Sequence, residues 1–291
     1  MRNSFVLLAL LSVLLISCQK EPDLLTGGSG GNGGSGSGGN TNGTRLVRTV
    51  SKMGSDSVVT VYTYNSNGKF INVKTTGMSG GIDQANEFRY YRNSSGVITR
   101  KVQINPNLAS AGIDSVVTTV LYNSSLSRYT GDVSSLSAFG FTVNDSTVHV
   151  YDGSGKVART EEYQAVPSIG QPYELSLKSI YTYDAAGNVK QMDIYSHDAT
   201  TNTDDLVATL KYTFDNKTAA ITYGADAIGI GQVDLVSVNN PLKAEFVDVT
   251  DPTNNQTFVF TYTYNSNNRP STGTNTVTPG NTVSNLSYYY Q

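Results

Sequence analysis

The heptapeptide YDAAGNV at residues 183–189 decides the fold of this chain, because it recurs as YNSNGKF at 64–70 and as YDGSGKV at 151–157. In these copies an Asp or Asn follows the aromatic residue and opens a type I turn by bonding its own backbone. A Gly three positions later takes the left-handed conformation of a G1 bulge. Looser copies begin at Tyr91, Tyr122, Phe214 and Tyr264. The repeat therefore predicts about seven β-hairpin tips.

The segments that flank these tips have the alternation of strands. β-Branched and aromatic residues alternate with polar ones at 57–64 (SVVTVYTY) and 258–264 (FVFTYTY), for example. The copies lie about 30 residues apart, except that the last interval is 50 residues long and contains an insertion at about 224–241. We therefore expect an all-β fold, an antiparallel meander of about seven repeated β-hairpins that forms an extended, curved or half-barrel sheet.

The N-terminal sequence predicts export and a lipid anchor. Residues 5–16 are mostly apolar and too few to cross a roughly 30 Å hydrocarbon core, which is typical of a signal peptide. The run ends in LISC at 15–18, and this string resembles the lipobox of bacterial lipoproteins, in which the Cys is acylated and becomes the mature N-terminus. The resemblance implies that Cys18, the only Cys of the chain, carries acyl chains.

Three parts of the chain follow from this prediction. Residues 1–17 are a lipoprotein signal peptide, 18–43 are the acylated Cys and a Gly/Ser/Asn-rich tether, and 44–291 are a single repetitive β domain. The segment QKEPD at 19–23 resembles the acidic export signal of some Gram-negative lipoproteins. This resemblance implies a place in the outer membrane on the extracellular face, whereas a generic spacer would leave the protein facing the periplasm.

The hairpin string also resembles a known repeat. The string YTYDAAGNV at 181–189 resembles the YD repeat of RHS-type shells, although the spacing here is about 30 residues instead of about 20. The whole layout is similar to uncharacterised β-meander lipoproteins of Gram-negative bacteria. That resemblance covers most of residues 56–291 and implies an antiparallel sheet with no assigned activity.

Tyrosine stands at the anchor of six of the seven copies and two residues before the anchor in four, and residues two apart share one face of a sheet. The candidate ligand-binding residues are Tyr62, Tyr64, Tyr181, Tyr183, Tyr212, Tyr262 and Tyr264. Such a face suits a glycan or a protein partner, or it packs across strands and touches no ligand. A second hypothesis is a carrier that holds a lipid or another apolar ligand in a half-closed barrel.

Composition argues against several other functions. The formal charge is −3 with 15% charged residues, so we expect no nucleic-acid partner. His149 stands two residues before an anchor, where other copies have a tyrosine, and His197 stands beside a polar loop. Neither histidine joins a recognisable catalytic set. We therefore expect no enzyme, no catalytic residue, no metal site and no cofactor. Asp/Asn-rich loops at 198–205 and 248–255 leave a calcium site open, although neither has a known calcium-loop spacing.

Overall fold

The computed structural model describes residues 44–138 and 140–291, and the predicted leader, Cys18 and tether lie outside the described residues. The strands are β1 (Leu46–Met53), β2 (Asp56–Tyr64), β3 (Phe70–Ser79), β4 (Ile82–Asp83), β5 (Asn86–Arg92), β6 (Ile98–Ile104), β7 (Val116–Asn123), β8 (Arg128–Ala138), β9 (Phe141–Tyr151), β10 (Val157–Val166), β11 (Gln171–Tyr183), β12 (Val189–Asp198), β13 (Thr203–Thr218), β14 (Asn239–Asp248), β15 (Gln256–Tyr264), β16 (Pro270–Thr278) and β17 (Thr282–Tyr290). The short helices are η1 (Pro106–Ala111), η2 (Pro167–Ile169), α2 (Asp226–Gly229), η3 (Val233–Val236) and η4 (Pro252–Asn254).

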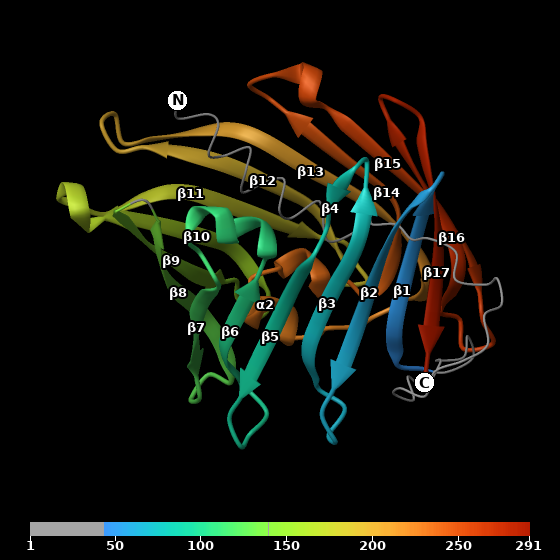
Figure 1. Cartoon of the computed structure of the whole chain (residues 1–291). Helices are drawn as coiled ribbons and strands as arrows, with labels where there is room; N and C mark the ends of the chain where they lie inside the picture. Colours follow the sequence, from blue (N-terminus) through green and yellow to red (C-terminus); the bar gives the residue numbers. More distant parts are fainter. Residues whose placement is uncertain (1–43, 139) are drawn as a thin grey trace.

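The strands form an antiparallel meander that closes on itself (Figure 1). Of the seventeen strands, β4 has only two residues, and the other sixteen form the ring. Closure comes from β1, in which Val50 pairs with Val59 of β2 on one side and with Ser287 of β17 on the other. The predicted meander is thus confirmed, but the predicted extended or half-barrel sheet is wrong. Pairing of the first strand with the last leaves neither edge open to other chains. Local sequence patterns could not predict this pairing, because the two strands are far apart in the chain.

The repeated tips lie together at one end of the barrel, and the described chain enters and leaves at this same end. The backbone N–H of Thr44 donates to the carbonyl oxygen of Gln291 at 3.2 Å. At the tip of 183–189, Asp184 accepts from the backbone N–H of Asn188 at 2.9 Å, and Gly187 has a φ of 93°. These are the turns that the sequence predicts. One copy is shifted, because Asn93 opens its turn and Arg92, not Tyr91, holds the anchor position.

The apolar core lies inside the ring. Phe258 and Phe260 of β15 are buried with Ala244 of β14 and Leu286 of β17, and Tyr262 packs against the same cluster. Two further buried clusters line the rest of the wall, one around Tyr90, Ile98 and Tyr129 and one around Met192, Leu210 and Phe246. Period-2 alternation therefore directs the aromatic and aliphatic residues of each strand inward.

The opposite face of most strands is polar. On β15, Thr261 and Thr263 alternate with the inward aromatics and are exposed. On β14, Lys243 and Glu245 alternate with Ala244 and Phe246, and their charged groups lie 2.8 Å apart. The hydroxyl of Thr261 bonds that of Thr274 at 2.7 Å across β15 and β16. The outer wall is thus mostly threonine and charged residues, although apolar side chains such as Tyr91, Leu121 and Val259 also face outward.

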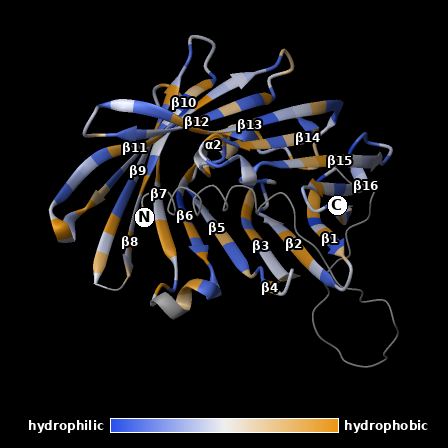
Figure 2. Ribbon diagram, turned by 90° about the horizontal axis from the view of Figure 1, so that it is seen from above, coloured by the Kyte–Doolittle hydropathy of each residue, from blue (hydrophilic) through white to orange (hydrophobic). Residues whose placement is uncertain are grey.

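The long last interval of the repeat folds into the barrel. Residues 219–238, between β13 and β14, contain α2 and η3, and we call this segment the plug. Viewed from above, α2 lies within the ring of strands (Figure 2). The plug takes the place of the hairpin tip that the copy at Phe214 would otherwise form. No helix in the described ranges is long and apolar enough to cross a membrane.

Candidate functional site

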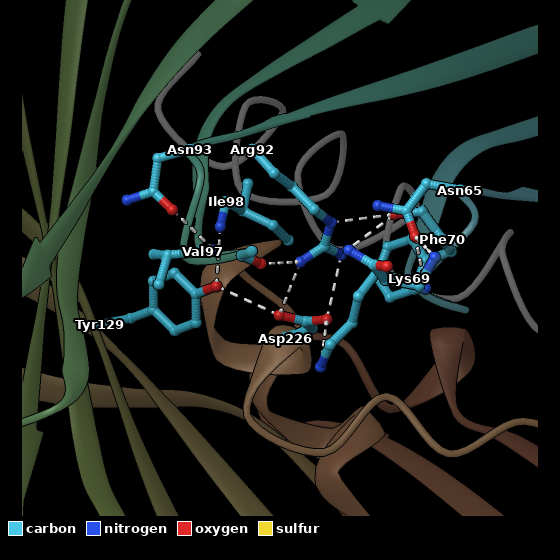
Figure 3. A network of polar contacts seen from close by, with 11 residues as sticks. Asn65, Lys69, Phe70, Arg92, Asn93, Val97, Ile98, Tyr129 and Asp226 are labelled. Carbon is cyan, nitrogen blue, oxygen red and sulfur yellow. Dashed lines mark hydrogen bonds and ion pairs between the residues drawn. The ribbon is translucent and has the colours of Figure 1, made fainter.

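The plug is fastened to the wall by a buried ion pair (Figure 3). The guanidinium of Arg92 donates to both carboxylate oxygens of Asp226, at 3.2 and 3.0 Å. The same guanidinium donates to the carbonyl oxygen of Phe70 at 3.0 Å, and the Tyr129 hydroxyl donates to Asp226 at 3.1 Å. The Arg92 side chain is 5% exposed, so the charge is satisfied entirely by protein groups.

Three other contacts hold the plug at the end of the barrel where the hairpin tips lie. The Asn188 side-chain oxygen accepts from the backbone N–H of Val238 at 2.9 Å. The Arg269 guanidinium donates to the carbonyl oxygen of Ala219 at 2.6 Å. The Lys101 ammonium donates to the carbonyl oxygen of Ile230 at 3.2 Å and pairs with Asp132. Since Asn188 and Arg269 belong to hairpin tips, the plug is fastened to this end of the barrel.

A cavity of about 250 Å³ remains between the plug and the wall formed by β1, β2, β13, β14, β15 and β17. Its lining is mostly apolar and includes Leu46, Tyr62, Tyr212, Phe258, Phe260, Tyr262 and Leu286. The lining extends along β15 from Tyr262 to Phe258, away from the hairpin tips. The plug contributes Tyr223, Asp234 and Leu235. A concave apolar space with a few polar groups is the usual form of a small-molecule site.

The plug places one carboxyl in this cavity. Asp234 accepts a hydrogen bond of 3.4 Å from the hydroxyl of Tyr212. Burial raises the pKa of Asp234 above its ordinary value, although the bond from Tyr212 and a backbone N–H act in the opposite direction. Burial likewise raises the pKa of the Tyr212 hydroxyl, and the nearby Asp234 raises it further. Burial thus disfavours the ionised form of each group, and a positive charge placed beside Asp234 would favour its carboxylate form.

The seven tyrosines predicted from sequence all face the barrel interior, in two different settings. Tyr62, Tyr212 and Tyr262 line the cavity, and Tyr181 lies beside it with its hydroxyl 3.3 Å from that of Thr160. The remaining three, Tyr64, Tyr183 and Tyr264, stand at strand ends near the tips and bond to protein groups. The structure thus brings only part of the predicted set together around one space.

The strand-end tyrosines fasten each hairpin to its neighbour. The Tyr64 hydroxyl donates to the carbonyl oxygen of Leu46 at 2.7 Å, and the Tyr183 hydroxyl donates to that of Val157 at 2.8 Å. Tyr151 and Tyr290 make the same contact with Tyr129 and Pro270. Tyr264 instead donates to the carboxylate of Asp215. In the four carbonyl contacts a tyrosine at the end of one strand reaches the start of the preceding strand.

The other polar candidates are dispersed. His149 is buried beside plug residue Ile228, and burial lowers its pKa. His197 lies at the far end of β12, with its Nδ1 2.9 Å from Asp204. In the loop before β15, Asp248 accepts from the backbone N–H groups of Thr250 and Asp251, so its oxygens cap the loop. Within the described ranges, no three His, Cys, Asp or Glu residues converge as metal ligands do.

Comparison with known proteins gives the fold. No family model and no curated protein matches the chain. The crystal structure of a porin-like protein from Bacteroides vulgatus superposes with a TM-score of 0.52 over 85% of this chain and 99% of that chain, at 12% identity. A porin-like protein from Bacteroides uniformis gives a TM-score of 0.49 over 87% of this chain and 99% of that chain, at 13% identity. The likeness is one of fold.

Sequence reasoning missed the plug and its two carboxyls, Asp226 and Asp234. The only signal was the length of the last repeat interval, which marked an insertion without indicating that it folds inward. Neither Asp stands in a motif, because each meets its partner, Arg92 or Tyr212, only after the barrel closes.

Proposed function

We propose that this protein is a lipid-anchored lipoprotein of the outer membrane, whose barrel stands in water and binds a small apolar ligand between the plug and the wall. The observation that carries the proposal is the polarity of the barrel. Aromatic and aliphatic side chains fill the inside, and the outside is mostly threonine and charged residues with scattered apolar side chains. A barrel that spans a bilayer has the reverse pattern, an apolar band outside and a polar lumen.

The outer wall suits water for an energetic reason. A Lys at the bilayer midplane costs about 2 to 4 kcal/mol. Lys211 in the middle of β13 is exposed and pairs in register with Glu245 of β14, beside Lys243. In water these charges remain solvated and cost little. The membrane attachment is therefore assigned to the acyl chains of Cys18 and not to the strands.

The point at which the chain enters the barrel indicates which end of the barrel faces the membrane. The tether predicted at 18–43 joins the barrel at Thr44, at the end where the plug is fastened to the hairpin tips. A Gly-rich coil of about 25 residues spans roughly 25 to 30 Å. The end of the barrel that holds the plug thus faces the membrane. The acidic segment 19–23 supports the extracellular leaflet as the place of anchoring.

The position and volume of the cavity favour one of the ligand classes considered from the sequence. Tyr62, Tyr212 and Tyr262 lie inside the barrel, so a protein partner has no access to their rings. A space of about 250 Å³ lies below the range of roughly 300 to 1,000 Å³ typical of ligand pockets, so it fits a compact molecule better than a long lipid. Binding of a small apolar molecule is therefore favoured, with no reaction assigned.

Filling the cavity tests the binding proposal. Ala244 lines the cavity, and Val259 on the neighbouring strand faces outward and is 42% exposed. In the acylated protein held in lipid nanodiscs, 2-phenylethanol should raise the melting temperature of the wild type and of Val259→Phe, because a ligand that binds only the folded state stabilises it. The same addition should leave Ala244→Phe unchanged. An equal rise in all three proteins would place binding elsewhere.

Replacement of Cys18 tests the anchor separately. Cys18→Ala should lose palmitate labelling and leave the membrane fraction, since no second Cys is present to accept an acyl chain. Labelling that persists in this variant would overturn the proposed anchor. Replacing residues 19–23 by Ala should abolish protease access on intact cells while membrane fractionation stays the same.

A further inference from the structure

The lining of the cavity contains an acidic group and no basic group. Of the described residues that line the cavity, Asp234 is the only one with a carboxyl, and none is Lys, Arg or His. The ionisable groups that interact with Asp234 are tyrosines on three separate segments: Tyr181 on β11, Tyr212 on β13 and Tyr223 on the plug. An ionised Asp234 therefore has no countercharge within this part of the protein.

Asp234 faces the empty space and not a filled core. Protein atoms surround the carboxyl closely enough for burial to dominate its pKa, yet the residue keeps part of its surface accessible. The burial and the remaining accessibility of Asp234 agree if its accessible surface faces the cavity, whose lining includes Asp234. Its hydrogen bond from Tyr212 is long, at 3.4 Å, so the carboxyl retains capacity to accept a stronger donor.

We infer that the cavity takes a small amine, with its ammonium group on Asp234 and its apolar body among the rings of Tyr62, Tyr212 and Tyr262. This inference rests on the proposed function and names its ligand class. A carboxylate in a mostly apolar cavity attracts a cation more strongly than it attracts a neutral donor. The faces of tyrosine rings also attract cations, so the lining supports the same charge. An anion would meet the carboxyl and no positive group.

Three probes of nearly equal shape distinguish the possibilities. They are 2-phenylethylamine, which is cationic at neutral pH, the neutral 2-phenylethanol and the anionic 3-phenylpropionate. Binding is measured by titration calorimetry on the acylated protein in lipid nanodiscs, with empty nanodiscs as the control for partition into lipid. We expect the amine to bind about tenfold more tightly than the alcohol, and the acid to bind most weakly.

The variant Asp234→Asn removes the charge and keeps the shape of the side chain. In this variant the amine and the alcohol should bind within about twofold of each other, with affinity for the alcohol unchanged. If the alcohol or the acid binds the wild type as tightly as the amine does, the amine inference is wrong while the proposed cavity stands. If the amine keeps its advantage in Asp234→Asn, Asp234 is not its partner. If none of the three probes binds the wild type, the proposed binding function itself fails.

Discussion

At the scale of single residues, the tyrosines of the repeat occupy two kinds of position, one at the strand end and one on the wall of the cavity. A tyrosine at a strand end, such as Tyr64 or Tyr183, uses its hydroxyl to bond a backbone carbonyl of the preceding strand. Tyrosines two positions earlier, such as Tyr62 and Tyr262, line the cavity, and the Tyr262 hydroxyl also donates to the carbonyl oxygen of Pro241 on the preceding strand at 3.0 Å. Sequence alternation predicted that all of them share one face. It gave no means of separating the two groups, because the separation depends on where the plug ends.

Loss of one fastening hydroxyl should cost a measurable part of the stability. Tyr64→Phe removes the 2.7 Å bond to the Leu46 carbonyl and should lower the free energy of unfolding by about 1 kcal/mol. Tyr173 is 51% exposed on β11, so Tyr173→Phe serves as the matched control with no expected change. Urea denaturation measures both. Two variants of equal stability would show that the strand-end hydroxyl does not hold the hairpins together.

Glu162 should make stability depend on pH. Burial raises its pKa from 4.5 to about 7; Asp132 and Asp145 add to the rise, and Lys101 acts against it. The folded protein thus holds this proton more tightly than the unfolded chain does, so stability is full below about pH 4.5 and falls as the pH rises to 7. Relative to the wild type, Glu162→Gln should gain about 3 kcal/mol between pH 4.5 and 7.

Urea unfolding at several pH values measures this difference. His149 titrates in the same range with the opposite effect, since burial lowers its pKa and its contribution to stability is lost as the pH falls below 6.5. Its contribution is common to both proteins and drops out of the comparison. A difference between Glu162→Gln and the wild type that stays constant with pH would contradict the assigned pKa.

At the scale of elements, hairpins follow from local sequence and the plug does not. The turn at 183–189 needs only an Asp, a Gly and alternating flanks, all of which lie within a few residues. The plug is held by Arg92, Asn188 and Arg269, which are far from it in the chain. Such contacts form only when distant hairpins assemble, so the sequence predicted the place of the insertion but not its direction.

The Arg92–Asp226 ion pair of the plug should contribute more to the free energy of unfolding than the exposed Lys69 beside it does. Asp226→Ala leaves the Arg92 charge buried without its partner and should lower the free energy of unfolding by about 3 kcal/mol. Lys69 approaches the same carboxylate at 4.0 Å but its side chain is 54% exposed, so Lys69→Ala should cost less than about 1 kcal/mol. Equal losses in urea unfolding would show that Arg92 does not fasten the plug.

At the scale of the whole molecule, a barrel fold alone does not determine whether the wall lies in water or in a membrane, and the polarity of the outward side chains bears on that question. The superposition with a porin-like protein describes the path of the chain, whereas the environment of the wall depends on which side chains face outward. Sequence alternation predicted one apolar face per strand. Closure decided that this face points inward, and closure depends on the pairing of β1 with β17, which are separated by nearly the whole described chain.

The most direct test of the account is the environment of an outward side chain in the middle of the wall. Thr261 is exposed on β15. If Cys18 is acylated as proposed, it offers no free thiol, so Thr261→Cys takes a single nitroxide label, with the unaltered protein as the unlabelled control. In native membranes, electron paramagnetic resonance compares collisions with a water-soluble nickel chelate and with oxygen, which concentrates in lipid. A barrel that stands in water should show strong collision with the nickel chelate. Collision dominated by oxygen would place the wall in the bilayer and contradict the account.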